Sequence, residues 1–349
     1  MLALLAGGGV VLGQFSGPGG GLPLNGGGFG GPPGGGPGGV GRRGGGRGGR
    51  GGLGGGGGGF GGVGASTGPY VRLEGINGGY VNEDTVKTAR ETMGHSVDLP
   101  TWTNAPGFKN DVFTFARIIF HSQVGGVGYG RGGGGRGWVI DYPDADVNVS
   151  FRLRQFTSMK VDPDCRVLRL TDADLPRYPL IYMEHVERIG LTDPETTALR
   201  KYLNAGGALL VNDTWGDAAA QHFMEVMKTV LPNQQWTELS INHPLFHCVF
   251  DLKGPMNNLQ VPTMQFLNYD YDPTDPNSKP TRARQYGWEN VHFWALFDDH
   301  QHLMVLFINN SDVSDGWERE GENETYFHLF SEKRAYPLAI NIFYYFMTN

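Results

Sequence analysis

The chain has 349 residues, a formal net charge of −7 and two cysteines, Cys165 and Cys248. Four arginines are the only charged side chains before Arg72, so this leading part carries +4 and the remainder carries −11. An acidic remainder disfavours nucleic acid as the main ligand of the folded part. Two cysteines exclude a disulfide framework and a zinc cluster, and they leave open either one bridge or two separate thiols.

Composition divides the chain into three parts. Residues 1–13, MLALLAGGGVVLG, are apolar, too short to span a bilayer and typical of a signal peptide, which predicts export to the periplasm or out of the cell. Residues 14–69 are rich in Gly and Arg, and we predict a disordered linker because they have little apolar surface to bury. Residues 70–349 are predicted to form a single α/β domain. We expect no transmembrane span.

The first elements of this domain are short. A helical pattern covers Asn82–His95, and the first strong strand pattern is Phe113–Phe120. A second Gly/Arg loop, 125–137, leads to Trp138. The segment after Asp146 fits both the spacing of a helix and the alternation of a strand, so both assignments stay open.

The centre of the domain alternates strands with helices. One helix begins at a capping box, Thr192–Glu195, and stops at Gly206, and a second carries an apolar stripe and stops at Pro232. The apolar strand patterns around them are Val167–Leu170, Leu180–Met183 and Ala208–Val211. This alternation predicts βαβ units and a mainly parallel sheet. The elements expected after it are an antiparallel hairpin, His292–Phe297 with Leu303–Ile308, and a docked helix, Ala335–Met347.

Specific motifs occur in order over about 210 residues of the domain. They are WVIDYPDADVN at 138–148, LTDADL at 170–175, YPLIY at 178–182, LRKYLNAGG at 199–207, NDTWG at 212–216, HPLFH at 243–247, NNSDVSDGWE at 309–318 and AINIFYYFMT at 339–348. Together they resemble the bacterial family called domain of unknown function 4159. The chain departs from that family at the Gly/Arg insertion before Trp138 and at Asn349, where the family usually has His.

This resemblance implies a fold and a location but no activity. The implied fold is a three-layer, flavodoxin-like sandwich similar to class I glutamine amidotransferases. The implied location is the envelope of Gram-negative-type bacteria, where such proteins are often encoded near von Willebrand A-domain proteins and MoxR-type ATPases. Amidotransfer itself is not expected, because neither cysteine lies in the G-x-C-x-G turn that carries the nucleophile in those enzymes.

Polar residues follow the predicted parallel strands, and ligands of an open parallel sheet bind beyond the carboxyl ends of its strands. The residues taken as catalytic candidates are Asp141, Asp146, Asp213 and His243. Those taken as binding candidates at the same edge are Asp172, Glu184, His185 and Trp215. Carboxylates grouped with histidine suit a hydrolase, although helix caps and turns use the same residue types, and both interpretations stay open.

A polar loop after the last strand contributes further binding candidates, Asp312, Asp315, Trp317 and Glu318. Its tryptophan either stacks on a sugar or pins the loop by being buried. Metal motifs fail, because the Asp144–Gln155 segment lacks the Gly and Glu of a calcium loop and the histidine pair is not HEXXH. We therefore expect neither a metal nor a cofactor.

Three functions follow from these observations. The leading hypothesis is an extracytoplasmic, non-catalytic binding or scaffold domain that recognises an envelope protein or glycan, including the von Willebrand A-domain or MoxR-associated membrane system. The second is a hydrolase of an envelope polymer or glycan. The third is an RNA binder that uses the GRRGGGRGGRGG tract, which requires a cytosolic leader. Carboxylates within hydrogen-bond reach of one another in a cleft favour the enzyme, and carboxylates dispersed as caps favour binding.

Overall fold

The computed structural model describes residues 69–73, 79–95, 97–108, 111–122, 137–282 and 287–349. The predicted signal peptide, the predicted linker up to residue 68 and most of the Gly/Arg loop 125–137 lie outside the described residues. The chain divides into two units, Met1–Gly59 and Phe60–Asn349, and everything described below belongs to the second unit.

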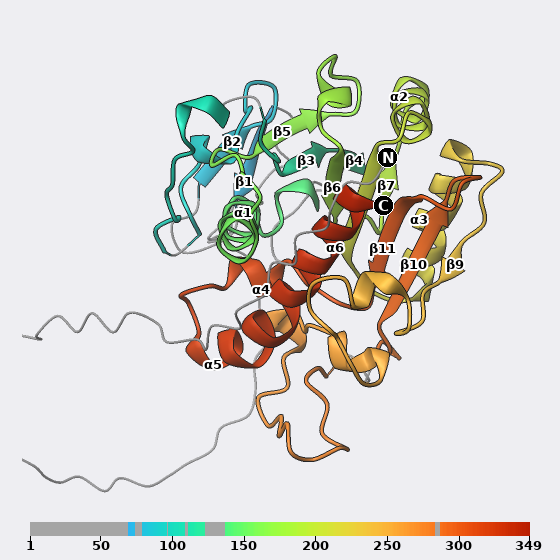
Figure 1. Ribbon diagram of the computed structural model, residues 1–349. Coiled ribbons are helices and arrows are strands. Elements are labelled where there is room, and N and C mark those ends of the chain that lie inside the picture. The colour runs from blue at the N-terminus through green and yellow to red at the C-terminus, as the bar shows by residue number, and fades with distance from the viewer. Residues whose placement is uncertain (1–68, 74–78, 96, 109–110, 123–136, 283–286) are drawn as a thin grey trace, which may run out of the picture. The chain divides into compact units, whose positions relative to one another are not determined.

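The centre of the described residues is a seven-stranded sheet in which five neighbouring strands run parallel (Figure 1). Across the sheet its strands are β5 (Arg166–Arg169), β3 (Ala116–Ile119), β6 (Leu180–Glu184), β8 (Ala208–Thr214), β11 (Leu303–Asn309), β10 (His292–Phe297) and β9 (Thr237–Glu238). Strand β10 runs antiparallel to both of its neighbours. The mixed α/β class with a mainly parallel sheet and a C-terminal hairpin is therefore confirmed.

The strand order reveals where the winding of the sheet reverses. Numbered along the chain, the five parallel strands lie in the order 2-1-3-4-5, which is the order of flavodoxin-like folds. The reversal lies between β3 and β6, since the chain leaves β3 toward β5 but leaves β6 toward β8. The closer likeness to glutamine amidotransferases stays a prediction.

Helices cover both faces of the sheet because right-handed crossovers on the two sides of a reversal place their helices on opposite faces. The helices are α1 (Asp144–Phe156), α2 (Asp193–Asn204), α3 (Asp217–Val230), α4 (Asp315–Glu318), α5 (Glu324–Tyr326), the π-helix η9 (Phe327–Ala335) and α6 (Tyr336–Thr348). Helix α1 packs against α4 and α6, whereas α2 packs against α3 (Figure 1). No helix among the described residues is long and apolar enough to cross a membrane.

Local sequence signals explain several of these boundaries. The capping box at Thr192 and Glu195 starts α2 as expected. The segment after Asp146, whose sequence fits both a helix and a strand, lies in the helix α1. The predicted helix Asn82–His95 contains only the 3-10 turn η1 (Ala89–Glu91). Backbone hydrogen bonds from Ala89 to Asp164 and from Val167 to Lys87 join the middle of this segment to the chain beside β5, so it forms single turns and no continuous helix. The predicted strand Phe113–Phe120 is shortened to β3.

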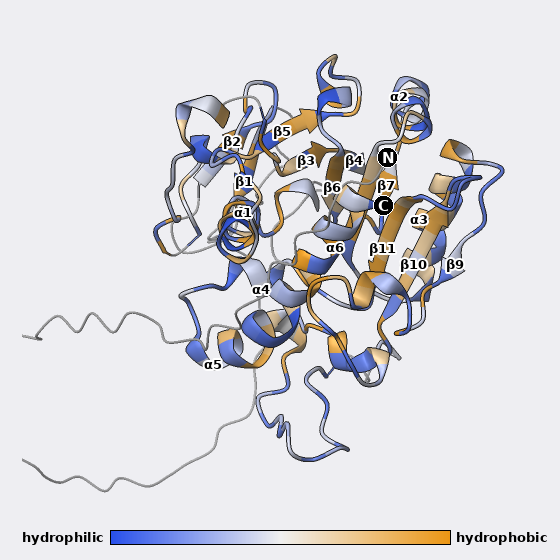
Figure 2. Ribbon diagram, in the orientation of Figure 1, coloured by the Kyte–Doolittle hydropathy of each residue, from blue (hydrophilic) through white to orange (hydrophobic). Residues whose placement is uncertain are grey.

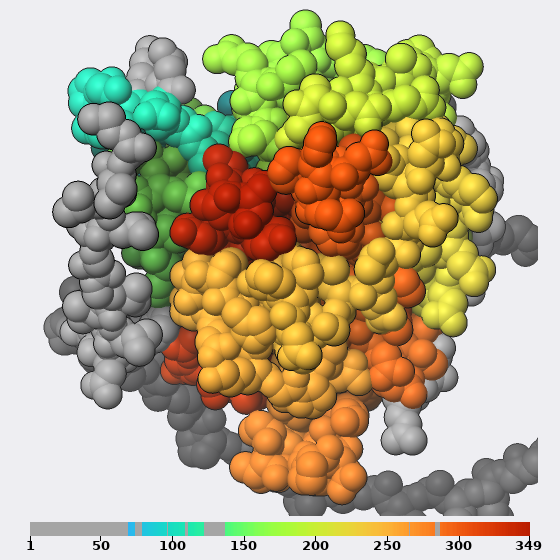
Figure 3. All heavy atoms as spheres, turned by 45° about the vertical axis from the view of Figure 1, so that its right-hand side comes forward, coloured from blue at the N-terminus to red at the C-terminus, as the bar shows by residue number. Residues whose placement is uncertain are grey.

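Short elements complete the described chain. They are β1 (Tyr70–Leu73) paired with β2 (Gly79–Asn82), β4 (His121–Ser122) paired with β7 (Ile189–Gly190), and the 3-10 turns η2 (Pro106–Phe108), η3 (Gly137–Val139), η4 (Leu175–Arg177), η5 (Pro244–Phe246), η6 (Met256–Leu259) and η7 (Met264–Phe266). Turns η5 to η7 belong to the long connection from β9 to β10, which forms a broad part of the face in Figure 3.

The core lies on both sides of the central strands. All residues of β3, β6, β8 and β11 are buried, which explains their continuous apolar sequences (Figure 2). Arg117, in the middle of β3, is a buried exception, and the polar residues at the ends of β6 and β8 are others. The polar residues at the ends of β6 and β8 mark the carboxyl edge of the sheet.

Candidate functional site

Polar residues at this carboxyl edge hold an unusual backbone conformation. Asp141, His185, Asp213 and Asn310 have φ values of 55°, 55°, 50° and 59°, in the left-handed region that side-chain-bearing residues rarely adopt. His185 and Asn310 directly follow β6 and β11, and Asp213 is the penultimate residue of β8. Four of the six non-glycine residues with positive φ in the described chain therefore lie at one edge of the sheet.

Hydrogen bonds tie these strand ends together. The backbone N–H of His185 donates to the carbonyl oxygens of Asn212 and Asp213 at 3.2 and 3.1 Å, and that of Asn310 donates to Thr214 at 2.8 Å. Gly137 lies so close to the end of β6 that a Cβ there would stand 2.6 Å from the His185 carbonyl oxygen. The turn that carries Asp141 is thus packed directly against the end of β6.

Arg117 anchors this edge at the reversal between β3 and β6. Its Nε donates to Asp146 at 2.9 Å, its Nη1 donates to the carbonyl of Ile140 at 3.1 Å, and Nη1 also pairs with Glu184. Burial lowers the pKa of Arg117, but the two carboxylates outweigh it, so the guanidinium stays charged. Because its Ile140 bond fixes the residue before Asp141, Arg117 positions that carboxylate as well.

Five buried carboxylates form what we call the acidic edge, namely Asp141, Asp213, Asp312, Asp315 and Glu318. One carboxylate oxygen from each of Asp141, Asp315 and Glu318 lies within 4.8 Å of the other two. Burial raises the pKa of Asp312 well above its usual value, and the charges of Asp213 and Asp141 raise it further. The five carboxylates therefore act on one another electrostatically.

Basic groups neutralise this edge only in part. Arg319 donates from Nε to Asp315 at 2.8 Å, and its Nη2 lies 2.8 Å from Glu318 Oε2 without the geometry of a hydrogen bond. Asp315 also accepts the backbone N–H of Met264 at 2.7 Å. In contrast, Asp141 Oδ2 is buried without a hydrogen-bond partner in the described part of the chain. Burial and neighbouring carboxylates accordingly raise the pKa values of Asp141 and Glu318.

Within the pair of His185 and Asp213, the aspartate titrates near neutral pH and the histidine stays protonated there. Burial raises the pKa of Asp213 to about 7, against the opposing effect of His185. Burial lowers the pKa of His185, but Glu187, 2.9 Å from its Nδ1, outweighs this and raises it to about 10. Trp215 donates from Nε1 to Asp213 Oδ1 at 2.8 Å and orients that carboxylate.

The structure brings together most of the site residues expected from the sequence. Glu184 and Asp146 lie beneath the acidic edge as the partners of Arg117, so neither is free to act on a ligand. His185 and Trp215 adjoin Asp213 at the edge itself. Arg117 and Arg319 were missed, although a single arginine in an apolar strand is a sequence signal for a buried ion pair.

Other expected site residues lie elsewhere or have a different role. His243 caps η5 and packs against Phe297 and Tyr345, beside the amino end of β11 and thus at the opposite edge. Asp172 accepts the backbone N–H of Arg169 in a turn. Trp317 is only 1% exposed and packs against Tyr182, so it has no open face for a sugar.

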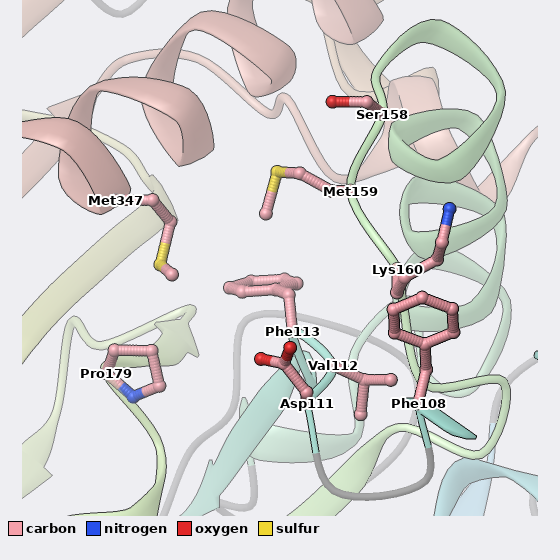
Figure 4. A pocket seen from close by; sticks show the side chains of 9 residues that line it. All are labelled: Phe108, Asp111, Val112, Phe113, Ser158, Met159, Lys160, Pro179 and Met347. Carbon is pink, nitrogen blue, oxygen red and sulfur yellow. The ribbon is translucent and has the colours of Figure 1, made fainter. Parts of the chain in front are cut away.

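A shallow pocket of about 350 Å³ lies at the amino edge of the sheet, away from the acidic edge. Figure 4 shows Phe113 and Met159 in the middle of its lining, with Met347 and Pro179 on one side and Phe108 and Lys160 on the other. Phe113 precedes β3 and Pro179 precedes β6, which places this pocket at the strand beginnings. Its lining includes no carboxylate besides Asp111, so it offers little for acid–base or metal chemistry.

The cysteines take no part in the acidic edge. Cys165 and Cys248 are both free thiols, which resolves the choice left open by the sequence. Burial raises the pKa of the Cys165 thiol, so it is not a nucleophile at neutral pH.

Comparison with known proteins agrees with the motifs. The model of a family described as Domain of unknown function (DUF4159) matches residues 123–347. This range includes every member of the acidic edge, from Asp141 to Glu318. No curated protein matches the chain.

Proposed function

The chain belongs to the DUF4159 family, and from this membership and the acidic edge we propose that it is an exported ligand-binding domain of the bacterial cell envelope. Its ligand binds at the carboxyl edge of the sheet, over the reversal between β3 and β6. The apolar residues 1–13 support export, and the strand order supports the position of the binding site.

One observation carries the proposed site, namely the left-handed backbone at Asp141, His185 and Asp213. Such conformations cost free energy and are concentrated at functional sites. Here they occur at the strand ends where doubly wound sheets bind ligands. A sheet that needed these residues only as turns would be served as well by glycine, which adopts positive φ without strain.

The charge of the site indicates the ligand's chemistry. Five carboxylates face two cationic groups, Arg319 and His185, so the edge favours a partner that presents a positive charge. Sugar recognition is less favoured, since Trp215 and Trp317 are both buried. We therefore propose a protein partner with an exposed basic side chain, and the von Willebrand A-domain or MoxR-associated membrane system supplies the first proteins to test.

Site-directed photocrosslinking tests this proposal in the native host. Ala218 is exposed in the first turn of α3, five residues after Asp213, and Glu225 is exposed two turns further along the same helix. A photoreactive residue at position 218 should form a crosslink to a partner, and Asp213→Asn should abolish this crosslink. A photoreactive residue at position 225 should form no crosslink. Equal products at both positions, or products unaffected by Asp213→Asn, would contradict the site. A crosslink to a glycan instead of a protein would show that the partner is a glycan and contradict the proposed protein partner.

A second function, hydrolysis of an envelope polymer, is favoured by the convergence of Asp213 with His185. A carboxylate with a pKa of about 7 is suited to accept a proton at neutral pH. The wild-type chain should then release soluble fragments from purified sacculi, and Asp213→Asn should release none. Absence of fragments from the wild type over the pH range 5–9 would eliminate this alternative and leave the binding function.

A further inference from the structure

We propose that Asp141, Asp315 and Glu318 form a binding site for a hard divalent cation, Mg²⁺ or Ca²⁺, at the acidic edge. Two independent observations point to it, the spacing of the three carboxylates and the unpartnered oxygen of Asp141 among the described residues. The inference goes beyond the proposed function, because such a cation can bind whether the edge recognises a partner or hydrolyses a polymer.

The spacing of the ligand atoms fits one shared ion. Oxygens that bind the same Ca²⁺ at about 2.3–2.6 Å lie at most about 5 Å apart, whereas oxygens that bind the same Mg²⁺ at about 2.0–2.1 Å lie at most about 4 Å apart. The three carboxylate oxygens lie within 4.8 Å of one another. This spacing fits Ca²⁺ directly, whereas Mg²⁺ would require the side-chain oxygens to move closer together.

Asp141 provides a second observation besides the grouping of the three carboxylates, namely an unpaired buried oxygen. Its side chain is 5% exposed, and its Oδ2 has no hydrogen-bond partner among the described residues. A buried carboxylate oxygen is normally paired, because it loses its hydration on burial. Since this carboxylate belongs to the three-carboxylate group, a cation bound there would supply the missing partner.

The remaining two ligands are already oriented. Asp315 is fixed by the N–H of Met264 at 2.7 Å and by Arg319 at 2.8 Å, and Arg319 also pairs with Glu318. Such outer contacts fix ligand geometry in metal sites. When the three carboxylates are ionised, they and one guanidinium leave two negative charges, which a dication neutralises. Oxygen ligands alone favour Mg²⁺ or Ca²⁺ over zinc or copper.

Asp141→Asn is the decisive variant. It removes the ligand charge while keeping the side-chain shape, and asparagine tolerates the left-handed backbone found at this position. Asp299→Asn is the matched control, because Asp299 is exposed in the turn before β11, at the edge of the sheet opposite to the three ligands. The full chain, the variant and the control are treated with EDTA, dialysed and titrated with MgCl₂, CaCl₂ or spermidine.

Binding is measured by calorimetry, and the Tm is measured in parallel. We expect one cation per chain and a raised Tm for the wild type and for Asp299→Asn. Asp141→Asn should bind the same cation at least tenfold more weakly, with a Tm that the cation does not change. Equal binding by all three proteins, or no binding by the wild type, would overturn the proposal. A response to spermidine alone would overturn it in favour of an organic cation.

Discussion

Two groups of buried charges lie side by side in this protein and differ in how completely they are satisfied. In the first, Arg117 pairs with Asp146 and Glu184 and also donates to backbone carbonyls. In the second, the acidic edge, Asp141 Oδ2 finds no partner among the residues that the structure describes, and like charges raise neighbouring pKa values. A group of buried charges that are all paired is accounted for by a structural role. A group with an unpaired buried carboxylate indicates that a ligand binds to it. Variants in both groups can test this distinction.

The largest effect is expected from Arg117→Met. This change leaves Asp146 and Glu184 buried without their counter-ion, which should cost about 3–5 kcal/mol of unfolding free energy. Urea denaturation followed by circular dichroism measures it. The triple variant Arg117→Met, Asp146→Asn, Glu184→Gln removes all three charges and should recover much of the loss. A single-variant loss below about 1 kcal/mol would show that the first group is not a tightly paired unit.

The variant Asp213→Asn should increase the stability of the fold at alkaline pH, whereas Arg117→Met decreases it. Because the folded-state pKa of Asp213 is raised from 3.8 to about 7, the folded state binds more protons than the unfolded state between these values. Asp213 therefore destabilises the fold progressively as pH rises through this window, and its penalty is complete above pH 7. The variant should be more stable than the wild type at pH 8, by a few kcal/mol at most (about 1.4 kcal/mol per unit of pKa shift), and nearly equal to it at pH 4.

Asparagine keeps the oxygen that accepts the Trp215 hydrogen bond and tolerates the left-handed backbone of this residue, so the comparison isolates the charge. Denaturation curves at both pH values, without divalent cations, provide the measurement. Destabilisation at pH 8 would mean that the carboxylate is already satisfied in the folded protein.

The smallest effect is expected from Glu187→Gln. Glu187 holds the pKa of His185 at about 10, so losing its charge should shift the His185 titration to lower pH, as followed by NMR. A histidine with a raised folded pKa stabilises the fold below pH 6.5 and loses that contribution as pH rises through about 10. His185 is 39% exposed, so the loss of stability at pH 7 should stay below about 1 kcal/mol. An unchanged titration would assign the shift to another neighbour.

The sequence by itself determined the order and type of the main elements and part of the site. Periodicity and capping are local properties, so α2, α3 and the hairpin of β10 with β11 follow directly from residue spacing. Asp213 could be placed at the carboxyl edge for a similar reason, since it lies at the end of an apolar strand of a parallel sheet. Asp141 was expected at this edge as well, although in the structure it follows the 3-10 turn η3 and not a strand.

Only the tertiary structure decided which polar residues meet and which charges remain unpaired. His243 and Asp213 both belong to recognisable motifs, yet they lie at opposite edges of the sheet. Trp317 and Glu318 are neighbours in the short helix α4, yet the first is a core residue and the second belongs to the acidic edge. Burial and pairing depend on contacts between residues far apart in the chain, such as Arg117 with Glu184, and local spacing carries no information about them.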